Sequence, residues 1–411
     1  MPALRPSLIV LLGALVAFGP LATDMYLPAF PAIGAALRAD PAVLQATLAG
    51  FFLGTGLGQL VYGPLADRFG RRPPLLAGIA LFTLASLGCA LAHSAEWLAW
   101  LRLLQGLGGC AGMVVARAVA RDLTQGPAMV RLMSQLMLVV GLAPILAPSL
   151  GGLLLGGFGW RAIFWVLTAY GAALLLAAGF GLPETLPAPA RRRDGPAAVL
   201  GVYLGLLRNR RFMADALAGA FSMAGMFAYI GGSPFVFMQL HGVSPGGYAL
   251  FFGLNAVGLV GTAQVNARLA RHVAPIQALR AAQAVQAAAG LALLLVALTG
   301  WGGLPAIAAL LFVFISGIGA VTPLATALAM APLGRVAGSA SALIGALQFC
   351  GGAASGALVG ALQDGTAVPM ALVLALSGLA GLALPMALRH RLAPEAAPPS
   401  AAAAAPQPLR Q

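Results

Sequence analysis

Two charged residues, Asp24 and Arg102, stand inside stretches of apolar residues that are long enough to cross a lipid bilayer. A charged side chain in hydrocarbon is costly, so it should face a protein interior or a water-filled cavity. A carboxylate can carry a proton. A nearby arginine favours its charged form, whereas burial favours its neutral form. We therefore predict that Asp24 and Arg102 form one proton-coupled unit.

The depths of the two residues allow them to meet. We expect the first apolar span to cover 8–29 and the fourth to cover 97–118, so each residue lies about five positions from the outer end of its helix. With a rise of ~1.5 Å per residue, both lie roughly 7–8 Å below the outer helix ends. Two other interpretations stay open. Arg102 could be an interfacial arginine that extends toward water, or the two could form an ion pair that only stabilises the fold.

The composition places the whole chain in a membrane. Its 411 residues are 60% hydrophobic and 8% charged, and the mean hydropathy is +0.94, whereas soluble domains carry about 25% charged residues. The net charge of +13 comes from arginines without any lysine. A soluble protein so basic would suggest nucleic acid. Here the arginines lie in short loops between apolar stretches, which fits membrane topology and not nucleic-acid binding.

Twelve stretches of membrane-spanning length predict an all-α membrane protein with two six-helix halves. A plan of two similar halves is typical of transporters whose substrate site lies near the midplane. We expect an N-terminal bundle at 1–182, a linker at 183–211, a C-terminal bundle at 212–390 and a disordered tail at 391–411. The linker is rich in proline and arginine and shows no pattern, so its backbone should be exposed. The spans are expected near 8–29, 42–65, 74–93, 97–118, 130–155, 161–182, 212–238, 246–266, 277–299, 304–328, 335–362 and 366–388.

The arginines also predict the orientation. If the N-terminus is inside, nearly all of them fall in the inner loops and the two ends, and the outer side holds only Arg38 and Arg161. Positively charged loops stay in the cytoplasm. We expect a multi-pass protein of the bacterial cytoplasmic (inner) membrane with both termini, the linker and the tail in the cytoplasm.

The remaining reactive residues do not form a recognisable catalytic or metal site. Cys89, Cys110 and Cys350 lie in apolar stretches, and the four histidines are scattered near the ends of such stretches. Neither set has the spacing of a metal site or of a disulfide framework. There is no glycine-rich loop with a lysine, so no nucleotide is implied. We predict no catalytic residue, no metal and no cofactor, with a proton gradient as the energy source.

The loop between the second and third spans carries a specific pattern. It reads Gly63-Pro-Leu-Ala-Asp67-Arg68-Phe-Gly70-Arg71-Arg72. The glycines permit a tight turn between closely packed helices. Asp67 can interact with a neighbouring helix N-terminus and with Arg68 or Arg71. The loop resembles the signature loop of the major facilitator superfamily, and this resemblance implies that it latches the two halves on the cytoplasmic side. An ordinary basic inside loop is the alternative.

Two further spans extend the resemblance. The fourth contains Arg102-Leu-Leu-Gln105-Gly106-Leu-Gly108, which resembles the family helix whose arginine is linked to proton coupling. The fifth resembles the antiporter motif of the drug/proton exchangers, with Ala147 where that motif has a glycine. Prolines bend a helix and glycines let neighbours approach, so a kinked packing helix without exchange chemistry is the alternative. The residues of this motif are Gly141, Pro144, Pro148, Gly151 and Gly152.

A narrower resemblance rests on the first and eleventh spans. The segments Thr23-Asp24-Met25-Tyr26-Leu27-Pro28-Ala-Phe-Pro31 and 337–349 are similar to the bicyclomycin-resistance (Bcr/CflA) branch of bacterial drug/proton antiporters, and the similarity covers roughly 8–390. An apolar substrate pocket would then be lined by aromatic, methionine and amide side chains. The candidates are Tyr26, Met113, Tyr229, Phe235, Met238, Gln348 and Phe349.

The function that these features predict is proton-driven multidrug efflux by alternating access, with antibiotic resistance as its consequence. The partners would be a small-molecule substrate, protons and membrane lipid, with no nucleic acid or nucleotide, and the chain would work as a monomer. A proton-coupled symporter of a nutrient on the same fold is the main alternative. A membrane-embedded enzyme would need a clustered nucleophile and base, and a receptor or scaffold would not require the latch loop.

Overall fold

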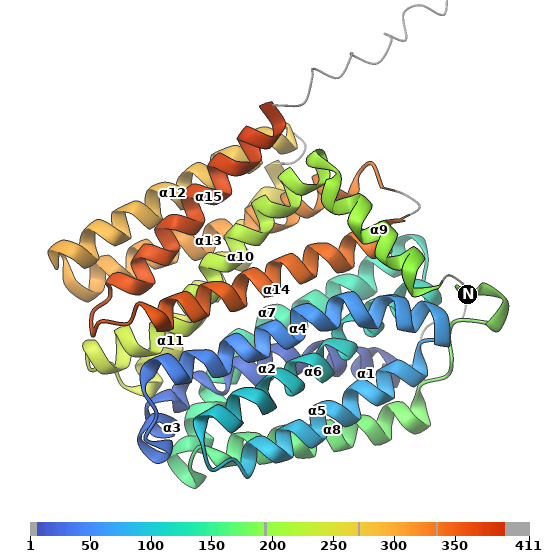
Figure 1. The fold of residues 1–411 in the computed structure, drawn as a ribbon, viewed down its shortest axis with the longest axis horizontal. Coiled ribbons are helices and arrows are strands. Elements are labelled where there is room, and N and C mark those ends of the chain that lie inside the picture. The colour runs from blue at the N-terminus through green and yellow to red at the C-terminus, as the bar shows by residue number, and fades with distance from the viewer. Residues whose placement is uncertain (1–5, 193–194, 270–271, 334–335, 391–411) are drawn as a thin grey trace, which may run out of the picture.

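The computed structural model of the protein describes residues 6–192, 195–269, 272–333 and 336–390. The described residues form helices and loops without a strand (Figure 1). The first half comprises α1 (Pro6–Val16), α2 (Phe18–Asp24), a 3₁₀ turn (Leu27–Ala29), α3 (Phe30–Leu37), α4 (Pro41–Phe69), α5 (Arg72–Ala90), α6 (Ala95–Leu123), α7 (Gly126–Phe158) and α8 (Arg161–Gly181). The remainder comprises a 3₁₀ turn (Ala188–Ala190), α9 (Pro196–Arg208), α10 (Arg210–Pro234), a π-helical turn (Phe235–Leu240), α11 (Pro245–Leu269), α12 (Pro275–Thr299), α13 (Gly303–Met330), α14 (Ala337–Ala361) and α15 (Val368–His390).

These helices account for the twelve predicted spans. Within the described residues, ten helices are long and apolar enough to cross a bilayer, and the bent pair formed by Pro6–Val16 and Phe18–Leu37 makes an eleventh. Helix α7 has 33 residues and an apolar sequence with one arginine, so it supplies the twelfth crossing. The predicted all-α class is confirmed.

The first span is broken, whereas the sequence predicted one helix ending near residue 29. Its two parts meet at an angle of 42° around Ala17. Pro20 lacks the amide hydrogen that would bond to the carbonyl of Val16, four residues earlier. Pro28 removes the corresponding bond to Asp24, where α2 ends. Helical structure then continues through α3 to Leu37, so Asp24 lies at a break and not five residues from a helix end.

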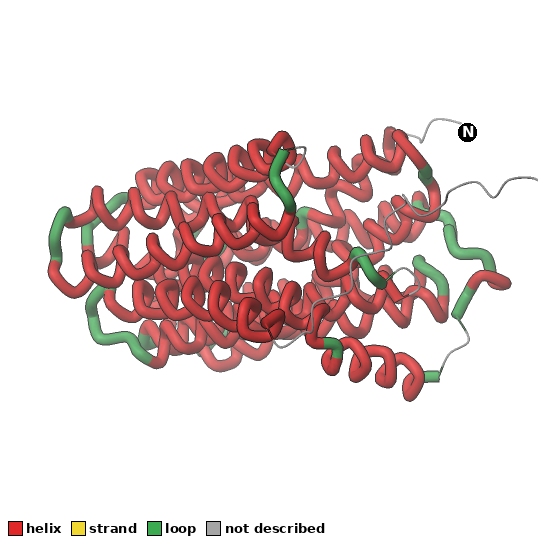
Figure 2. The backbone as a smooth tube through the Cα atoms, turned by 90° about the horizontal axis from the view of Figure 1, so that it is seen from above, coloured by secondary structure: helices red, strands yellow, loops and turns green. Residues whose placement is uncertain are grey.

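The two halves meet along two pairs of long helices. We call α1–α8 the N half and α10–α15 the C half. Helix α4 packs along α14, and α7 packs against α11. Figure 1 shows α4 and α14 lying side by side through the middle of the molecule. Figure 2, turned by 90°, shows the helices of both halves running along the same long axis with loops at their ends.

The linker contains a packed helix, so the prediction of an exposed, unpatterned segment at 183–211 was wrong for part of it. Helix α9 buries Tyr203 and Leu206 against residues of α10 and α14. The Tyr203 hydroxyl donates to the carbonyl of Leu60 in the second half of α4, 3.2 Å away. We call the end of the bundle that carries α9 the linker end, and the opposite end the far end. The tail prediction at 391–411 lies outside the described residues.

Helices α4 and α6 cross at glycines. A Cβ atom on Gly106 would lie 2.0 Å from the carbonyl oxygen of Phe51, and one on Gly54 would lie 2.0 Å from that of Leu103. Both obstacles are backbone atoms, which cannot turn aside as a side chain can. The glycines therefore let the two backbones approach closely, as small residues do between membrane helices.

We predict that Gly106→Ala destabilises the folded protein by about 1–3 kcal/mol because the added methyl group forces the two helices apart. The measurement is the melting temperature of the purified protein in detergent. Gly261→Ala on α11 is the matched control, since nothing lies within 4 Å of its Cβ position. Equal melting temperatures for the two variants would contradict the close-approach argument.

Candidate functional site

Arg102 is the most deeply buried charged side chain of the described chain, with 0% of its surface exposed. Its Nη1 donates to the carbonyl oxygen of Ala22 at 2.9 Å and to Oε1 of Gln105 at 2.5 Å. The guanidinium also lies over the rings of Tyr26 and Phe51, 4.6 and 4.5 Å from their centres. Desolvated contacts of this kind between a cation and an aromatic ring are worth about 2 kcal/mol. Arg102 therefore connects α6 to the first span and to α4.

Asp24 lies at the end of α2, two residues beyond that contact, and is 4% exposed. It accepts a hydrogen bond of 3.0 Å from the hydroxyl of its neighbour Thr23. The helices that carry Asp24 and Arg102 are thus neighbours at a similar depth. Among the described contacts, however, no hydrogen bond or ion pair joins the two side chains. Arg102 keeps two buried donors, Nε and Nη2, without a partner, and these could receive an anionic group in another state.

Across the half interface, Asp24 lies within electrostatic range of Tyr229 and Tyr248 in the C half. The Tyr229 hydroxyl accepts a hydrogen bond of 2.8 Å from the amide of Asn255. The Tyr248 hydroxyl is 3.0 Å from that of Ser233. Tyr229 was a pocket candidate, whereas Ser233, Tyr248 and Asn255 were not. Asn255 is an isolated amide within an apolar span, and such a side chain often forms hydrogen bonds between membrane helices. This could have indicated a polar site at its position.

Only some of the side chains predicted to line the substrate pocket lie near the interface between the halves. Phe349 lies near the centre of the half interface, with its ring 5.4 Å from that of Phe227. Phe227 in turn lies 4.0 Å from Phe52 of the N half. These rings join the halves by aromatic contact.

The other candidates lie apart from that cluster. Tyr26 is fully buried in the N half and bonded to the hydroxyl of Thr47 at 2.7 Å. Met113 lies farther along α6, where its carbonyl accepts from Arg117. Gln348 faces the Gly219 position on α10. Phe235 and Met238 lie in the π-helical turn after α10.

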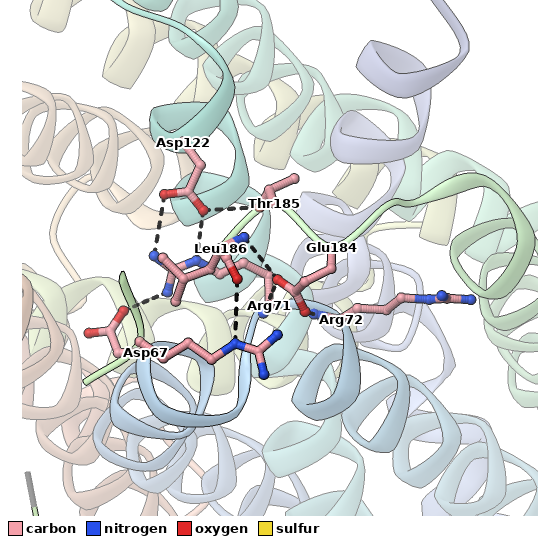
Figure 3. Close-up of polar contacts among 8 residues, drawn as sticks. Asp67, Arg71, Arg72, Asp122, Glu184, Thr185 and Leu186 are labelled. Atoms are coloured by element: carbon pink, nitrogen blue, oxygen red, sulfur yellow. Dashed lines mark hydrogen bonds and ion pairs between the residues drawn. The ribbon is translucent and has the colours of Figure 1, made fainter. Parts of the chain in front are cut away.

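The predicted loop at 63–72 is mostly helical, because α4 continues to Phe69 and α5 begins at Arg72, which leaves a turn at Gly70 and Arg71. A network of charges at the linker end holds this turn, as Figure 3 shows. Arg71 donates to Asp67 at 2.5 Å and to Asp122, at the end of α6, at 2.8 Å. Asp67 therefore pairs with Arg71, one of the two predicted partners. The other, Arg68, lies 5.5 Å from the ring of Phe69. The contacts of Asp67 that are described lie within the N half and the linker, where its carbonyl accepts from the amide of Arg192 at 2.9 Å.

Glu184 supports the same loop from the segment after α8. Its carboxylate accepts from the backbone amides of Arg71 at 2.8 Å and Arg72 at 3.2 Å, so it caps the start of α5 (Figure 3). Partial burial alone would raise the pKa of this carboxyl. The backbone amides of Leu186, Arg71 and Arg72 outweigh burial and hold the pKa of Glu184 below its ordinary value. Gly70, with φ of 95°, makes the turn that brings these amides together.

Several features of this loop were not predicted. Asp122 and Glu184 were not predicted as site residues. The chain has only ten acidic residues. Asp122 and Glu184 stand at the ends of long apolar spans, on the arginine-rich side, and this position could have indicated that they pair with arginines. Arg72 also reaches the carbonyl of Gly179 near the end of α8. Gly63 has open space at its Cβ position and lines a cavity described below.

The proposed antiporter motif lies on α7, which continues as one helix through both prolines. A Cβ on Gly151 would lie 2.1 Å from the carbonyl oxygen of Met25, so this glycine lets α7 approach the chain beside Asp24. Gly141 faces Val260 of α11 in the other half. Pro148 and Gly152 line a groove between α7 and α11. The side chain of Pro144 lies outside the described residues.

At the far end of the half interface, Gln45 near the start of α4 joins the two halves. Its amide donates to the carbonyl of Gly231 on α10 at 2.6 Å. The side chain also fills the space beside Gly360 at the end of α14. One N-half side chain thus contacts two helices of the C half.

At the linker end, Asp215 on α10 is 1% exposed and pairs with Arg389 of α15. This ion pair joins two helices of the C half.

Comparisons with known proteins agree with this architecture. The family model of the Major Facilitator Superfamily matches residues 11–357. The "Uncharacterized MFS-type transporter YdgK" of Bacillus subtilis is 38% identical, covering 92% of this chain and 94% of that protein. The "Bicyclomycin resistance protein homolog" of Haemophilus influenzae is 34% identical, covering 88% and 91%. The "Multidrug resistance protein MdtL" of Escherichia coli is 32% identical, covering 82% and 84%.

Solved structures show the same fold at low sequence identity. The crystal structure of a D-xylose-proton symporter matches with a TM-score of 0.68 over 92% of this chain and 96% of that chain, at 16% identity. This likeness concerns the arrangement of helices only.

Glu184→Ala should loosen the start of α5, because the amides of Arg71 and Arg72 lose their acceptor. The expected result is faster deuterium uptake in peptides that cover 68–75, measured by hydrogen exchange and mass spectrometry. Because the folded pKa of Glu184 is depressed, its stabilisation is present above the unfolded pKa and is lost as pH falls through the folded pKa.

The matched control is Glu96→Ala, in the first turn of α6 at the far end. Its exchange at 68–75 should equal that of the wild type. Unchanged uptake in Glu184→Ala would show that Glu184 does not hold this loop.

Proposed function

Because this chain belongs to the Major Facilitator Superfamily, we propose that it exports small, partly apolar drug-like molecules in exchange for protons. The family assignment rests on the model match over most of the chain and on relatives above 30% identity. Two of those relatives carry names of resistance to bicyclomycin or to multiple drugs. The observation that carries the coupling part of the proposal is the buried carboxyl of Asp24 at a helix break, beside Arg102 with two unpartnered donors.

The proton would be carried by Asp24. Its neutral, protonated form suits a buried position without a cationic partner. A rearrangement of the broken first helix could bring the carboxylate to the free donors of Arg102, which would favour proton release. Substrate binding beside Asp24 would drive the same change. The site would then hold either the proton on Asp24 or the substrate, and binding of one would release the other.

Transport would proceed by alternating access between the two ends. In the described state, Gln45 closes the far end by holding α10 and α14. At the linker end a cavity of ≈ 290 Å³ lies between the halves. Movement of one half against the other would break the Gln45 contacts and bring the charged segment at 63–72, which joins α4 to α5, toward α14.

The orientation and location follow from charge. The linker end carries the arginine-rich loops and α9, and we assign it to the cytoplasm of a bacterial cell, in the inner membrane. Both termini then lie in the cytoplasm. The substrate would move from the linker end to the far end.

A direct test begins with a susceptibility panel in an efflux-deficient bacterium that expresses this chain. The compound with the strongest protection is then added to purified protein in weakly buffered detergent, and proton release is measured. We expect release from the wild type and from Asp364→Asn, an exposed control acid at the far end. Asp24→Asn should release none while it still inserts and folds.

Release from Asp24→Asn equal to the wild type would exclude Asp24 as the carrier. The same compound is also tested in everted vesicles with an imposed proton gradient. Uptake into acid-inside vesicles is expected for exchange. Movement of the compound together with protons would instead support the symport alternative.

Gln45→Ala should favour opening of the far end, since it removes the hydrogen bond to Gly231 and the contact beside Gly360. In a cysteine-free background with Ser233→Cys, we expect severalfold faster labelling by a water-soluble maleimide added from outside. The exposed Gln277→Ala on α12 serves as control. Identical labelling rates would mean that Gln45 does not act as a gate.

A further inference from the structure

The cavity at the linker end has a polar lining from both halves that the transport proposal does not use. It has a volume of ≈ 290 Å³, near the lower limit of small-molecule sites. The N half contributes Gln59 of α4 and Arg117 and Arg121 of α6, and the C half contributes Ser339 at the start of α14. Tyr203 of α9 covers one side.

Two of these side chains are buried without a partner. Gln59 is 4% exposed and Ser339 is 8% exposed. In the part of the chain that the structure describes, neither has a hydrogen bond, although both line the cavity. Their polar atoms are not among the described atoms that are fully buried without a partner, so they keep accessible surface, and both residues line the cavity. A ligand in the cavity would supply the missing partners.

The charge of the lining indicates which ligand would fit. Four arginines and one aspartate line the cavity. The aspartate, Asp67, is already bonded to Arg71 at 2.5 Å. Arg117 donates its Nε to the carbonyl of Met113, and its Nη groups remain for another acceptor. Arg121 follows one turn later with no described partner, so two guanidinium groups are available to an anion.

The start of α14 adds to this preference. This helix has 25 residues, and its N-cap position, Val336, offers no side-chain acceptor to the first amides. Gly338, Ser339 and Ser341 of its first turns line the cavity. Unpaired amides at a helix N-terminus favour negative charge. The arginines, the hydroxyl of Ser339 and these amides thus converge on one space from two halves of the protein.

We propose that this cavity binds a small anion with a phosphate or carboxylate group, which joins α6 of the N half to α14 of the C half. The anionic oxygens accept from Arg117, Arg121, Ser339 and the first amides of α14, and Gln59 bonds to the remainder of the ligand. Because the ligand touches both halves, its binding stabilises the described state, in which the cavity lies between them at this end. The anion is either a soluble cytoplasmic compound or the headgroup of an acidic lipid, since both present the same chemistry.

The test uses the purified full chain in detergent without added lipid. Inorganic phosphate and succinate are titrated against chloride at equal ionic strength, and the melting temperature is recorded. We expect a saturable rise with phosphate or succinate beyond that with chloride. Arg117→Gln and Ser339→Ala should each weaken the apparent affinity about tenfold, the loss expected for one charged hydrogen bond. The exposed Arg280→Gln on α12 should match the wild type.

Nanodiscs distinguish the two sources of the anion. If free anions have no effect but phosphatidylglycerol nanodiscs stabilise the wild type more than Ser339→Ala, relative to phosphatidylcholine, the occupant is a lipid headgroup. Ser339→Ala removes only a hydroxyl, so it tests the site even if Arg117→Gln does not fold. The proposal is overturned if neither arm gives a saturable effect, or if both cavity variants respond as the wild type does.

Discussion

The burial of the Arg102 guanidinium is the constraint on which the N half depends. A cation with no exposed surface must be held by nearby polar and aromatic groups, because leaving it unpaired would cost several kcal/mol. The Nη1 of Arg102 donates to the carbonyl of Ala22 in the first span and to the side chain of Gln105. The amide of Gln105 in turn donates to the hydroxyl of Ser86 on α5 at 2.7 Å. The two donors that remain unpaired leave this arrangement incomplete in the described state. Two buried donors without a partner can accept a new one without first losing an existing hydrogen bond.

The two ends of the half interface use different chemistry. At the far end, neutral groups meet: the amide of Gln45 and the backbone of Gly231. At the linker end, the charges of Asp67, Arg71 and Asp122 are satisfied within the N half, and among the described residues no acid of that half is bonded to the facing start of α14. The contacts between the halves are neutral at the far end, and charged side chains line the interface at the linker end. The halves could therefore open one end and close the other without breaking a buried ion pair. The family fold makes such rocking possible, and these contacts would set its energy.

Much of the fold and part of the site could be predicted from the sequence. Apolar length gave the crossings, and the isolated charges of Asp24 and Arg102 indicated the region where α6 meets the first span. The bend at Ala17 and the helix α9 were missed, although Pro20 and the buried face around Tyr203 carried the information. The supports from Asp122 and Glu184 could not be assigned from sequence, because they depend on which helix ends converge. The predicted pocket residues do not lie together in the structure. Sequence periodicity could not select them, because it does not distinguish the helix face that lines the central interface from a face that packs on a neighbour or contacts lipid.

The central claim is that Asp24 changes its protonation state when substrate binds. Infrared difference spectroscopy of the purified protein, with and without the compound found by the susceptibility panel, observes this directly. The account predicts that the band of a protonated carboxylic acid disappears on addition of the compound to the wild type, and that Asp24→Asn lacks this change. If the variant shows the same carboxylic-acid signal as the wild type, or if the wild type shows none while it binds the compound, the proton is carried elsewhere and the account is contradicted.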